Sequence, residues 1–314
     1  MNKPNINFNV IHNNLTIGSD PEYAIVNEND EVIPLPHIQY DLGVNPVYWD
    51  TSENSRETKK YYHPVFVQDE KFKAIMDGVA VEFTLPPVNI NVPEEMFSNI
   101  SHGLIETAKL VAKFNFKVAA KPALKYNFEK YYDEHNELKR WCGIFGCDKD
   151  LDAIDPDYDS PDLDVREHIY RYFGGHIHVS DNNELIKDYP RPMIRFMAIC
   201  VGNICNAFSP YREEEKLRTF KYGQPGRFRE QYYPDGNIGV EYRSPSNFWT
   251  TSLDITKEVF KWTNVAYELL NTPEVGKEVL GKYLTPTIKA LQNADENLSK
   301  EILNDLGGNK ITRF

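Results

Sequence analysis

Two histidines one residue apart are the first residues in the sequence that suggest chemistry. They are His176 and His178, in the stretch GGHIHVS. On a β-strand, successive side chains point to opposite faces, so the two imidazoles share one face while Ile177 and Val179 share the other. An isolated pair of this kind is more often structural than metal-binding. Its interpretation therefore depends on which other residues share that face.

Three further short segments alternate between an apolar face and a charged face. GSDPEY carries Asp20 and Glu22, GVAVEFT carries Glu82, and GVEYRS carries Glu241 and Arg243. Each segment alone is typical of a solvated strand face or of a cross-strand ion pair. Acids and histidines on four strands, where Thr, Ser, Lys or Gln are usual, favour a shared site.

A convergence of carboxylates predicts bound cations. If the four strands share a sheet, so many carboxylates do not stay ionised together without positive charge between them. Oxygen-rich ligation with one imidazole suits Mg²⁺ or Mn²⁺ better than Zn²⁺. We expect a divalent-metal site whose ligands come from Asp20, Glu22, Glu82, His176 and Glu241.

Arginines follow the histidine segment along the chain. GQPGRFR is a glycine-containing stretch that we predict to be a loop, and it carries Arg227 and Arg229 ahead of Arg243. Guanidinium groups beside a magnesium cluster clamp phosphate oxygens and stabilise phosphoryl transfer. The alternative for Arg227 and Arg229 is a solvated loop, and Arg218 is a weaker candidate.

Composition and charge narrow the class of protein. The 314 residues are 41% hydrophobic and 13% aromatic, which is enough for a substantial core. The net charge of -12 argues against a nucleic-acid partner. The polar N-terminus and the interrupted apolar run 193–208 predict neither a signal peptide nor a membrane span. The four cysteines are better explained as reduced thiols than as a zinc site, so we expect a cytoplasmic protein.

The periodicity of the chain predicts an α+β fold in a single domain that spans 1–314. Strands are expected over 16–26, 78–85, 176–179 and 239–243. Helices are expected over 93–114, 192–208 and 253–270, and over 275–306 as one or two segments, so the part from about 253 is helical.

Two polar segments, 45–73 and 125–166, are expected to be excursions from the core. The second is rich in aspartate, which suggests calcium, but it lacks the glycine and the terminal glutamate of an EF-hand loop. A solvated loop is the simpler interpretation. Long loops of this kind are often lids or substrate-selecting loops, so a function is also open.

In their order along the chain, these motifs resemble those of the glutamine synthetase superfamily. GSDPEY resembles its GxExE strand with Asp20 in place of the first glutamate, GGHIHVS its GxHxH strand, and VEYRSP its ExR strand. The fuller pattern is similar to the phage-type carboxylate–amine ligases of that superfamily, the COOH.NH2 ligase type 2 group. The similar segments lie between residues 15 and 255 and include FGCDKD (145–150), RYFGGHIHVS (171–180), YGQPGRFR (222–229) and GVEYRSPSNFW (239–249).

The resemblance implies an enzyme that uses ATP to phosphorylate a carboxylate, which an amine then attacks to give an amide. It implies a curved, mainly antiparallel sheet whose concave face carries the site and whose outer face packs helices. The substrates would be the carboxylate of an amino acid, a peptide or a protein, and an amine. A homo-oligomer is compatible with this, whereas a membrane or nucleic-acid partner is not expected.

The resemblance also implies roles for individual residues. Glu22 and Glu82 would hold one metal ion, with Asp77 as a further candidate, and the second ion would be held by Asp20, His176 and Glu241. The residues that would contact ATP are His178, Arg227, Arg229 and Arg243, of which His178, Arg229 and Arg243 would be catalytic. Asp20 is shorter than the usual glutamate, which would shift or weaken the second metal. The general base stays open.

Two other classes of function fit the same residues. A divalent-metal hydrolase or a phosphotransferase would use the same acids and arginines. A non-catalytic nucleotide-binding protein, or a structural virion protein, would explain the fold but not the full set of charged residues.

Overall fold

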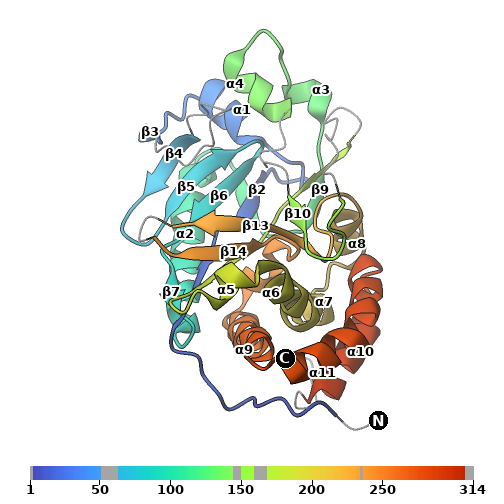
Figure 1. The fold of residues 1–314 in the computed structure, drawn as a ribbon. Coiled ribbons are helices and arrows are strands. Elements are labelled where there is room, and N and C mark those ends of the chain that lie inside the picture. The colour runs from blue at the N-terminus through green and yellow to red at the C-terminus, as the bar shows by residue number, and fades with distance from the viewer. Residues whose placement is uncertain (1–2, 51–62, 144–149, 159–167, 234–235, 308–314) are drawn as a thin grey trace.

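The protein is described by a computed structural model, which covers residues 3–50, 63–143, 150–158, 168–233 and 236–307 (Figure 1). These residues form an α+β structure, as predicted, and its strands pair antiparallel in two six-stranded sheets and one small sheet. No helix in the described part of the chain is long and apolar enough to cross a membrane.

The first large sheet, called sheet I, contains the histidine strand. Its order is β10 (Leu151–Asp152), β13 (Arg227–Tyr232), β14 (Ile238–Tyr242), β12 (Ile177–Asp181), β1 (Leu15–Ser19) and β7 (Val88–Asn89). Ile177 and Val179 are fully buried, which confirms that this side of the histidine strand is core. They belong to one continuous core with Met197 and Trp262 of the helices.

The second large sheet, called sheet II, carries Glu82. Its order is β3 (Tyr48–Asp50), β4 (His63–Gln68), β5 (Lys73–Asp77), β6 (Ala80–Thr84), β2 (Glu22–Val26) and β8 (Lys117–Ala119). A small sheet pairs β9 (Ala123–Lys125) with β11 (Tyr170–Tyr172). The four motif strands are therefore divided between sheets I and II, and the prediction that a single sheet carries them is wrong.

The division arises at Pro21. The single strand predicted over 16–26 is instead β1 and β2, which belong to different sheets. Proline has no N–H for a strand ladder, so it interrupts the pairing. Its carbonyl oxygen accepts a hydrogen bond from the N–H of Phe83 at 3.0 Å, so the chain joins sheet II directly after leaving sheet I.

Both predicted excursions contribute strands. Within 45–73, β3 and β4 extend sheet II, and Val65, Phe66 and Phe72 are buried. Within 125–166, β10 pairs with β13 at the edge of sheet I. The first segment therefore contributes to the core, and the second supplies an edge strand whose Leu151 is exposed. Residues 51–62, 144–149 and 159–167 lie outside the described residues. The predicted loop before Arg243 is also partly a strand, because β13 begins at Arg227.

The predicted helices are present with shifted ends. The long ones are α2 (Pro93–Ala112), α9 (Leu253–Asn271), α10 (Pro273–Gln292) and α11 (Glu296–Leu306). The apolar run near 200 is α6 (Pro190–Met197), a π-helical segment (Ala198–Gly202) and α7 (Asn203–Phe208). Prolines at the first turn of α2, α6 and α10 suit that position, where no N–H donor is needed.

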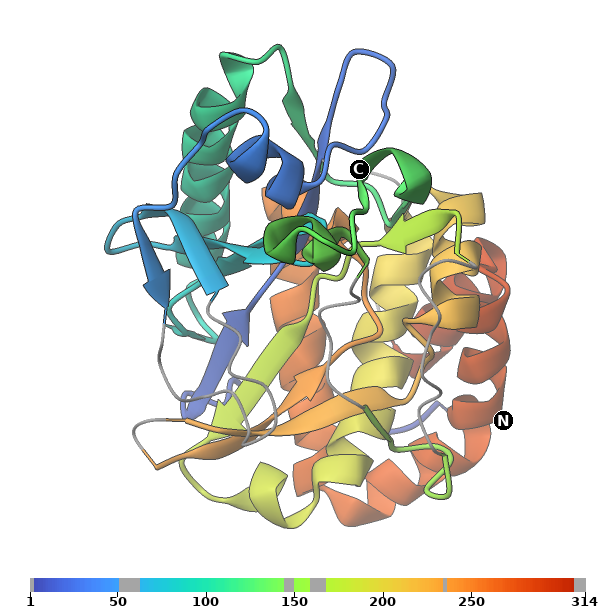
Figure 2. The ribbon, with the colours of Figure 1, turned by 90° about the horizontal axis from the view of Figure 1, so that it is seen from above.

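Shorter helices complete the fold. They are α1 (Leu35–Tyr40), α3 (Phe128–Tyr131), α4 (Glu137–Arg140), α5 (Leu185–Asp188) and α8 (Arg212–Lys221), with 3₁₀ turns at Trp141–Gly143 and Asn247–Thr251. Seen from above, α10 and α11 lie at one edge of the molecule and α2 at another, with strands of both sheets between them (Figure 2). The interior junction of the two sheets is where the acidic residues meet.

Candidate functional site

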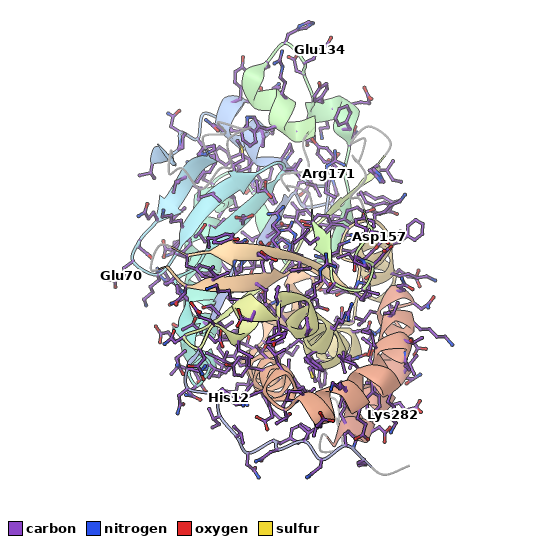
Figure 3. All side chains as sticks on the ribbon, in the orientation of Figure 1. His12, Glu70, Glu134, Asp157, Arg171 and Lys282 are labelled. Atoms are coloured by element: carbon purple, nitrogen blue, oxygen red, sulfur yellow. The ribbon has the colours of Figure 1, made fainter. Side chains whose placement is uncertain are left out.

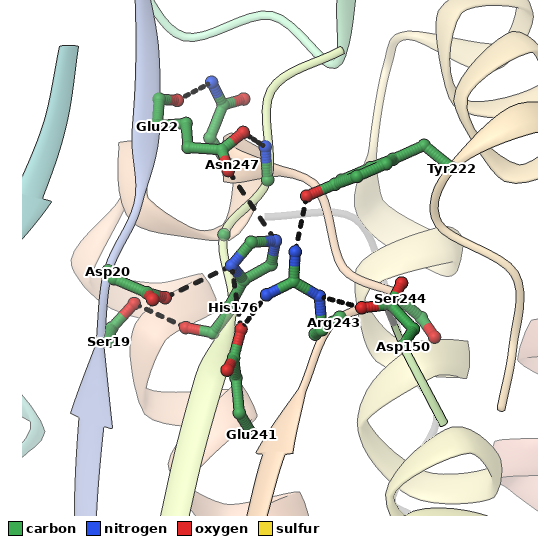
Figure 4. Close-up of polar contacts among 12 residues, drawn as sticks. Ser19, Asp20, Glu22, Asp150, His176, Tyr222, Glu241, Arg243, Ser244 and Asn247 are labelled. Atoms are coloured by element: carbon green, nitrogen blue, oxygen red, sulfur yellow. Dashed lines mark hydrogen bonds and ion pairs between the residues drawn. The ribbon is translucent and has the colours of Figure 1, made fainter. Parts of the chain in front are cut away.

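The chain crosses from sheet I to sheet II at residues 19–22, and this crossing is fixed against the segment that precedes β12. The Ser19 hydroxyl donates to the carbonyl oxygen of His176 at 2.7 Å. Glu22 is bound twice to Gly174: its N–H donates to the Gly174 carbonyl at 2.8 Å, and its carboxylate accepts from the Gly174 N–H at 2.7 Å. Asp20 and Glu22 are therefore held beside His176 (Figure 4).

Three carboxylates from sheet II form the first acidic group, which consists of Glu22, Asp77 and Glu82. One oxygen of each lies within 4.8 Å of the others. Glu22 and Glu82 are directly paired across β2 and β6, and Asp77 ends β5 just before the turn into β6. The strand register thus brings Glu22 and Glu82 together, and Asp77 completes the first acidic group.

The second acidic group combines the crossing with sheet I and consists of Asp20, His176 and Glu241. One ligand atom of each again lies within 4.8 Å of the others. The His176 Nδ1 atom lies 3.3 Å from Asp20 Oδ1 and 3.4 Å from Glu241 Oε1. These two groups are the same two sets that the family resemblance implies.

His176 lies between the two acidic groups. Its Nε2 atom is 3.9 Å from Glu22 Oε1, so the ring faces the second group on one side and the first group on the other. The side chain is 2% exposed, and neither ring nitrogen makes a hydrogen bond of regular geometry with a described residue. Buried ligand atoms that converge without such bonds fit a bound cation, which would satisfy them.

The acids perturb one another. Burial raises the pKa of Glu82 well above its usual range, and the nearby carboxylates of Asp77, Asp20, Glu22 and Glu241 add to the effect. Two of those neighbours shift the other way. Burial opposes ionisation of Asp20 and Glu241, but His178 and His176 hold the pKa of Asp20 low and Arg243 lowers the pKa of Glu241 to about 2.

His178 lies on the same side of the strand as His176 but in a more open position. Its Nε2 atom is 3.1 Å from Asp20 Oδ1, and its Nδ1 atom is 3.3 Å from the hydroxyl of Tyr233. Burial alone would lower the pKa of His178, but the charge of Asp20 raises it. The two histidines thus have different surroundings: His176 is among the acids, and His178 is at their outer side.

Arg243 is the arginine most closely joined to the acids. Its Nη1 donates to Glu241 Oε1, its Nη2 donates to the hydroxyl of Tyr222 at 2.7 Å, and its Nε lies 2.8 Å from Asp150 Oδ1. Figure 4 shows this guanidinium between His176 and Asp150. The predicted arginine therefore directly adjoins the second acidic group.

The other two predicted arginines differ in their surroundings. Arg229 is opposite Glu241 in the β13–β14 register, its Nε lies 3.7 Å from Asp150 Oδ1, and its side chain is 20% exposed. Arg227 is only 3% exposed and faces Asp152 at 3.4 Å. Its Nη2 donates to Gln224 at 2.8 Å, and the ring of Tyr158 covers it. The structure brings Arg229 and Arg243 together at Asp150, and it gives Arg227 separate partners.

Several residues at the site were not predicted from the sequence. Asp150 and Tyr222 bind Arg243, and Gln231 donates to the second oxygen of Glu241 at 2.5 Å. Gln231 follows Arg229 by two residues, so the alternation of a strand would have found it if this stretch had been recognised as a strand. Asp150 lies in the FGCDKD motif, but nothing in the sequence distinguishes it from the neighbouring aspartates.

No protein-family model matches the chain, and no curated protein matches it. The interpretation of the site therefore depends on its own geometry and on the motifs in the sequence.

The rest of the molecule offers no comparable cluster among the residues that the structure describes. Groups of three or more potential metal ligands occur there only as the two acidic groups. Charged residues such as Glu70, Glu134 and Lys282 lie at the rim, far from one another (Figure 3). Lys282, for example, makes an ordinary surface ion pair with Asp305 at 2.9 Å.

Proposed function

We propose that the chain is an ATP-dependent carboxylate–amine ligase that uses Mg²⁺ or Mn²⁺. The observation that carries the proposal is that the arginine pair Arg229 and Arg243 lies directly beside two acidic groups, which His176 joins. Phosphoryl transfer needs charge neutralisation and positioning rather than covalent protein chemistry, and this arrangement supplies both. We further propose that sheets I and II together form a catalytic fold of the glutamine synthetase type.

The two acidic groups fit two divalent cations. Glu22, Asp77 and Glu82 offer oxygen ligands alone, and Asp20, His176 and Glu241 offer two carboxylates and one imidazole. Such donor sets suit Mg²⁺ and Mn²⁺. When bound, the ions would neutralise the ATP phosphates beside these carboxylates. They would also relieve the repulsion between carboxylates that, together with burial, raises the pKa of Glu82.

The first chemical step would be carried by the arginine pair. An oxygen of the substrate carboxylate attacks the γ-phosphorus of ATP, the bond from that phosphorus to ADP breaks, and an acyl phosphate forms. Arg243 and Arg229 would stabilise the charge on the oxygens of the transferring phosphoryl group. Glu241 and Asp150 hold the Arg243 guanidinium in place for this role, and the more open His178 would donate a hydrogen bond to a phosphate oxygen.

The second step would release phosphate. The nitrogen of the amine attacks the acyl carbon, the bond from carbon to phosphate oxygen breaks, and the nitrogen loses a proton as the amide forms. The same arginines that stabilise transfer would then stabilise the departing phosphate. Enzymes that share a fold and a catalytic core act on many different substrates. We therefore propose a class of carboxylates and amines rather than one pair.

The test is a screen of pooled carboxylates with Mg·ATP and hydroxylamine, which traps an acyl phosphate as a hydroxamate. We expect ADP release that depends on both Mg²⁺ and a carboxylate, with hydroxamate formed in equal amount. Glu82→Gln should abolish both signals, whereas the exposed Glu70→Gln should retain them.

The outcomes separate the alternatives. ADP release with a phosphorylated acceptor and no hydroxamate would indicate a phosphotransferase. Cleavage of amides without ATP would indicate a metal hydrolase. Binding of Mg·ATP without turnover of any pool, unchanged in Glu82→Gln, would indicate a non-catalytic protein. Each of these results would contradict the ligase proposal.

A further inference from the structure

Arg218 is a buried arginine outside both acidic groups. It lies in α8, is 0% exposed, and makes no ion pair within 4.0 Å with a described residue. Burying a guanidinium is unfavourable unless its donors are satisfied. Two of its donors are used on one short segment of backbone: Nη2 donates to the carbonyl of Arg243 at 3.0 Å, and Nη1 donates to the carbonyl of Ser244.

These bonds fix the main chain that carries Arg243. That residue follows the last residue of β14, and its N–H donates to the carbonyl of Arg227 at 3.0 Å. Its own carbonyl is the group that accepts from Arg218. Arg243 is therefore held on one side by β13 and on the other by a guanidinium, at the point where the sheet ladder ends.

Arg218 also adjoins the turn that presents Tyr222, whose hydroxyl binds the Arg243 side chain. The N–H groups of Tyr222 and Gly223 both donate to the Arg218 carbonyl, at 2.8 and 3.0 Å. A Cβ atom on Gly223 would lie 1.9 Å from Arg218 Nη1, so only glycine allows this approach. One guanidinium is thus packed between the Arg243 backbone and the turn that carries a partner of its side chain.

The same helix holds the far end of this segment. Glu215, one turn before Arg218, accepts from the Ser246 hydroxyl at 2.6 Å. Ser246 bridges to Gly174, and the next residue, Asn247, donates to the carbonyl of Glu22 at 2.7 Å. Residues 243–247 therefore connect Arg243 to the backbone beside both acidic groups. Helix α8 binds this segment at two points, through Arg218 and Glu215.

We propose that Arg218 is a positioning residue that sets the Arg243 guanidinium relative to the two acidic groups. This role rests on the proposed function, because it concerns the alignment of Arg243 with a transferring phosphoryl group. The planar fork of Arg218 is needed to bind two consecutive carbonyls. A lysine has a single ammonium group in place of that fork, so it would not reproduce both bonds.

The test compares Arg218→Lys with Arg212→Lys. Arg212 lies on the same helix and also donates to backbone carbonyls, of Asn206 and Ala207, but away from residues 243–247. Calorimetry would measure the binding of Mg·ADP with and without aluminium fluoride, which mimics the transferring phosphoryl group. In the wild type, aluminium fluoride should increase the affinity for Mg·ADP. We expect Arg218→Lys to reduce this gain in affinity by about tenfold to a hundredfold and to leave the binding of Mg·ADP alone unchanged. Arg212→Lys should change neither.

The role of Arg218 is refuted if both variants lose the same part of that gain, or if Arg218→Lys keeps all of it. Loss of Mg·ADP binding together with the gain would show a general loss of structure instead, and would also refute it. As a second measurement, millimolar guanidinium should restore the gain in Arg218→Ala, whereas urea should not. If Arg218→Ala does not fold, Arg218→Lys decides alone.

These results stay distinct from failure of the ligase proposal. A wild-type protein that binds Mg·ADP and aluminium fluoride but forms no hydroxamate would refute the ligase reaction and leave the role of Arg218 to the two lysine variants. A wild-type protein that binds no nucleotide would refute both.

Discussion

The acidic groups and the arginine pair lie side by side, but their charges are balanced differently. Arg243 lies between Glu241 and Asp150, and Arg229 shares Asp150. At Glu82 of the first acidic group the balance is different: burial and four neighbouring acids raise its pKa. Arg243 and Arg229 thus have carboxylate partners within the protein, whereas Glu82 is surrounded by like charges, which a bound cation would offset.

This difference indicates how the site would work. Arginines held by carboxylates are already oriented, so they would bind a phosphoryl group without rearranging. At the first acidic group, by contrast, the proposed cations would offset the like charges that surround Glu82. We therefore predict that substitutions of the arginines strongly reduce turnover, and that the effects of substitutions of the acids depend on whether metal is present.

The largest effect is expected from Arg243→Met. Removal of the guanidinium takes the ion-pair partner from Glu241, leaves Asp150 with the more distant Arg229, and removes the proposed stabiliser of the transferring group. Hydroxamate formation should fall by about a hundredfold or more. The free energy of unfolding, measured with urea, should fall by about 3 kcal/mol. Arg229→Met should have the smaller effect on both quantities, because its side chain is more exposed; the reverse order would contradict the comparison.

The next largest effect is expected from metal itself. If the acids lack balancing charge, Mg²⁺ or Mn²⁺ should stabilise the folded chain, by about 2.7 kcal/mol at a concentration one hundred times its Kd. Thermal melts in EDTA and in increasing Mg²⁺ would measure this. A melting temperature that does not depend on Mg²⁺ would show that the acids are balanced in some other way.

A smaller effect is expected from Glu82→Gln in the absence of metal. Because the pKa of Glu82 is raised in the folded state, the folded chain binds more protons than the unfolded chain between the ordinary and the raised value. The stability of the wild type should therefore fall as the pH rises through that window. The glutamine variant should lose this dependence and be more stable than the wild type above that window.

Urea unfolding at several pH values in EDTA would test this, with Glu70→Gln as an exposed control. In Mg²⁺ the order should reverse, because the variant has lost a ligand. A Glu82→Gln protein that is less stable than the wild type in EDTA at every pH would contradict the interpretation of the first acidic group.

The smallest effect on turnover is expected from Asp152→Asn. Asparagine keeps the acceptor for the N–H groups of Ile154 and Asp155 but loses the charge that faces Arg227. The unfolding free energy should fall by about 1–2 kcal/mol, with hydroxamate formation nearly unchanged. A loss of turnover comparable to that of Arg229→Met would instead support the sequence-based assignment of Arg227 to the nucleotide.

Much of the candidate site could be predicted because strand alternation fixes which side chains share a face. That rule placed His176 with His178 and separated both from Ile177 and Val179, and the structure confirms the separation. Direct pairing of Glu22 with Glu82 then follows from register. The local sequence pattern was therefore sufficient to predict which face of each strand carries the acids and histidines.

The sequence was less informative where long-range pairing decides the structure. Pro21 marks an interruption, but only the pairing of β1 with β12 and of β2 with β6 shows that two sheets meet there. Asp150 reaches Arg243 because β10 pairs with β13, a contact between segments far apart in the chain. Arg218 was only a weak candidate for a phosphate contact, and no sequence pattern indicated its positioning role, because its partners are backbone carbonyls and any residue supplies those.

The central claim is that the two acidic groups are two cation sites within one catalytic site, and counting bound Mn²⁺ ions tests it most directly. Electron paramagnetic resonance on the wild type, Glu82→Gln and His176→Gln would measure free and bound Mn²⁺ in one titration. We predict two ions per chain for the wild type and one for each variant, with a different ion lost in each. A wild-type protein that binds no Mn²⁺, or variants that both retain two ions, would contradict the account.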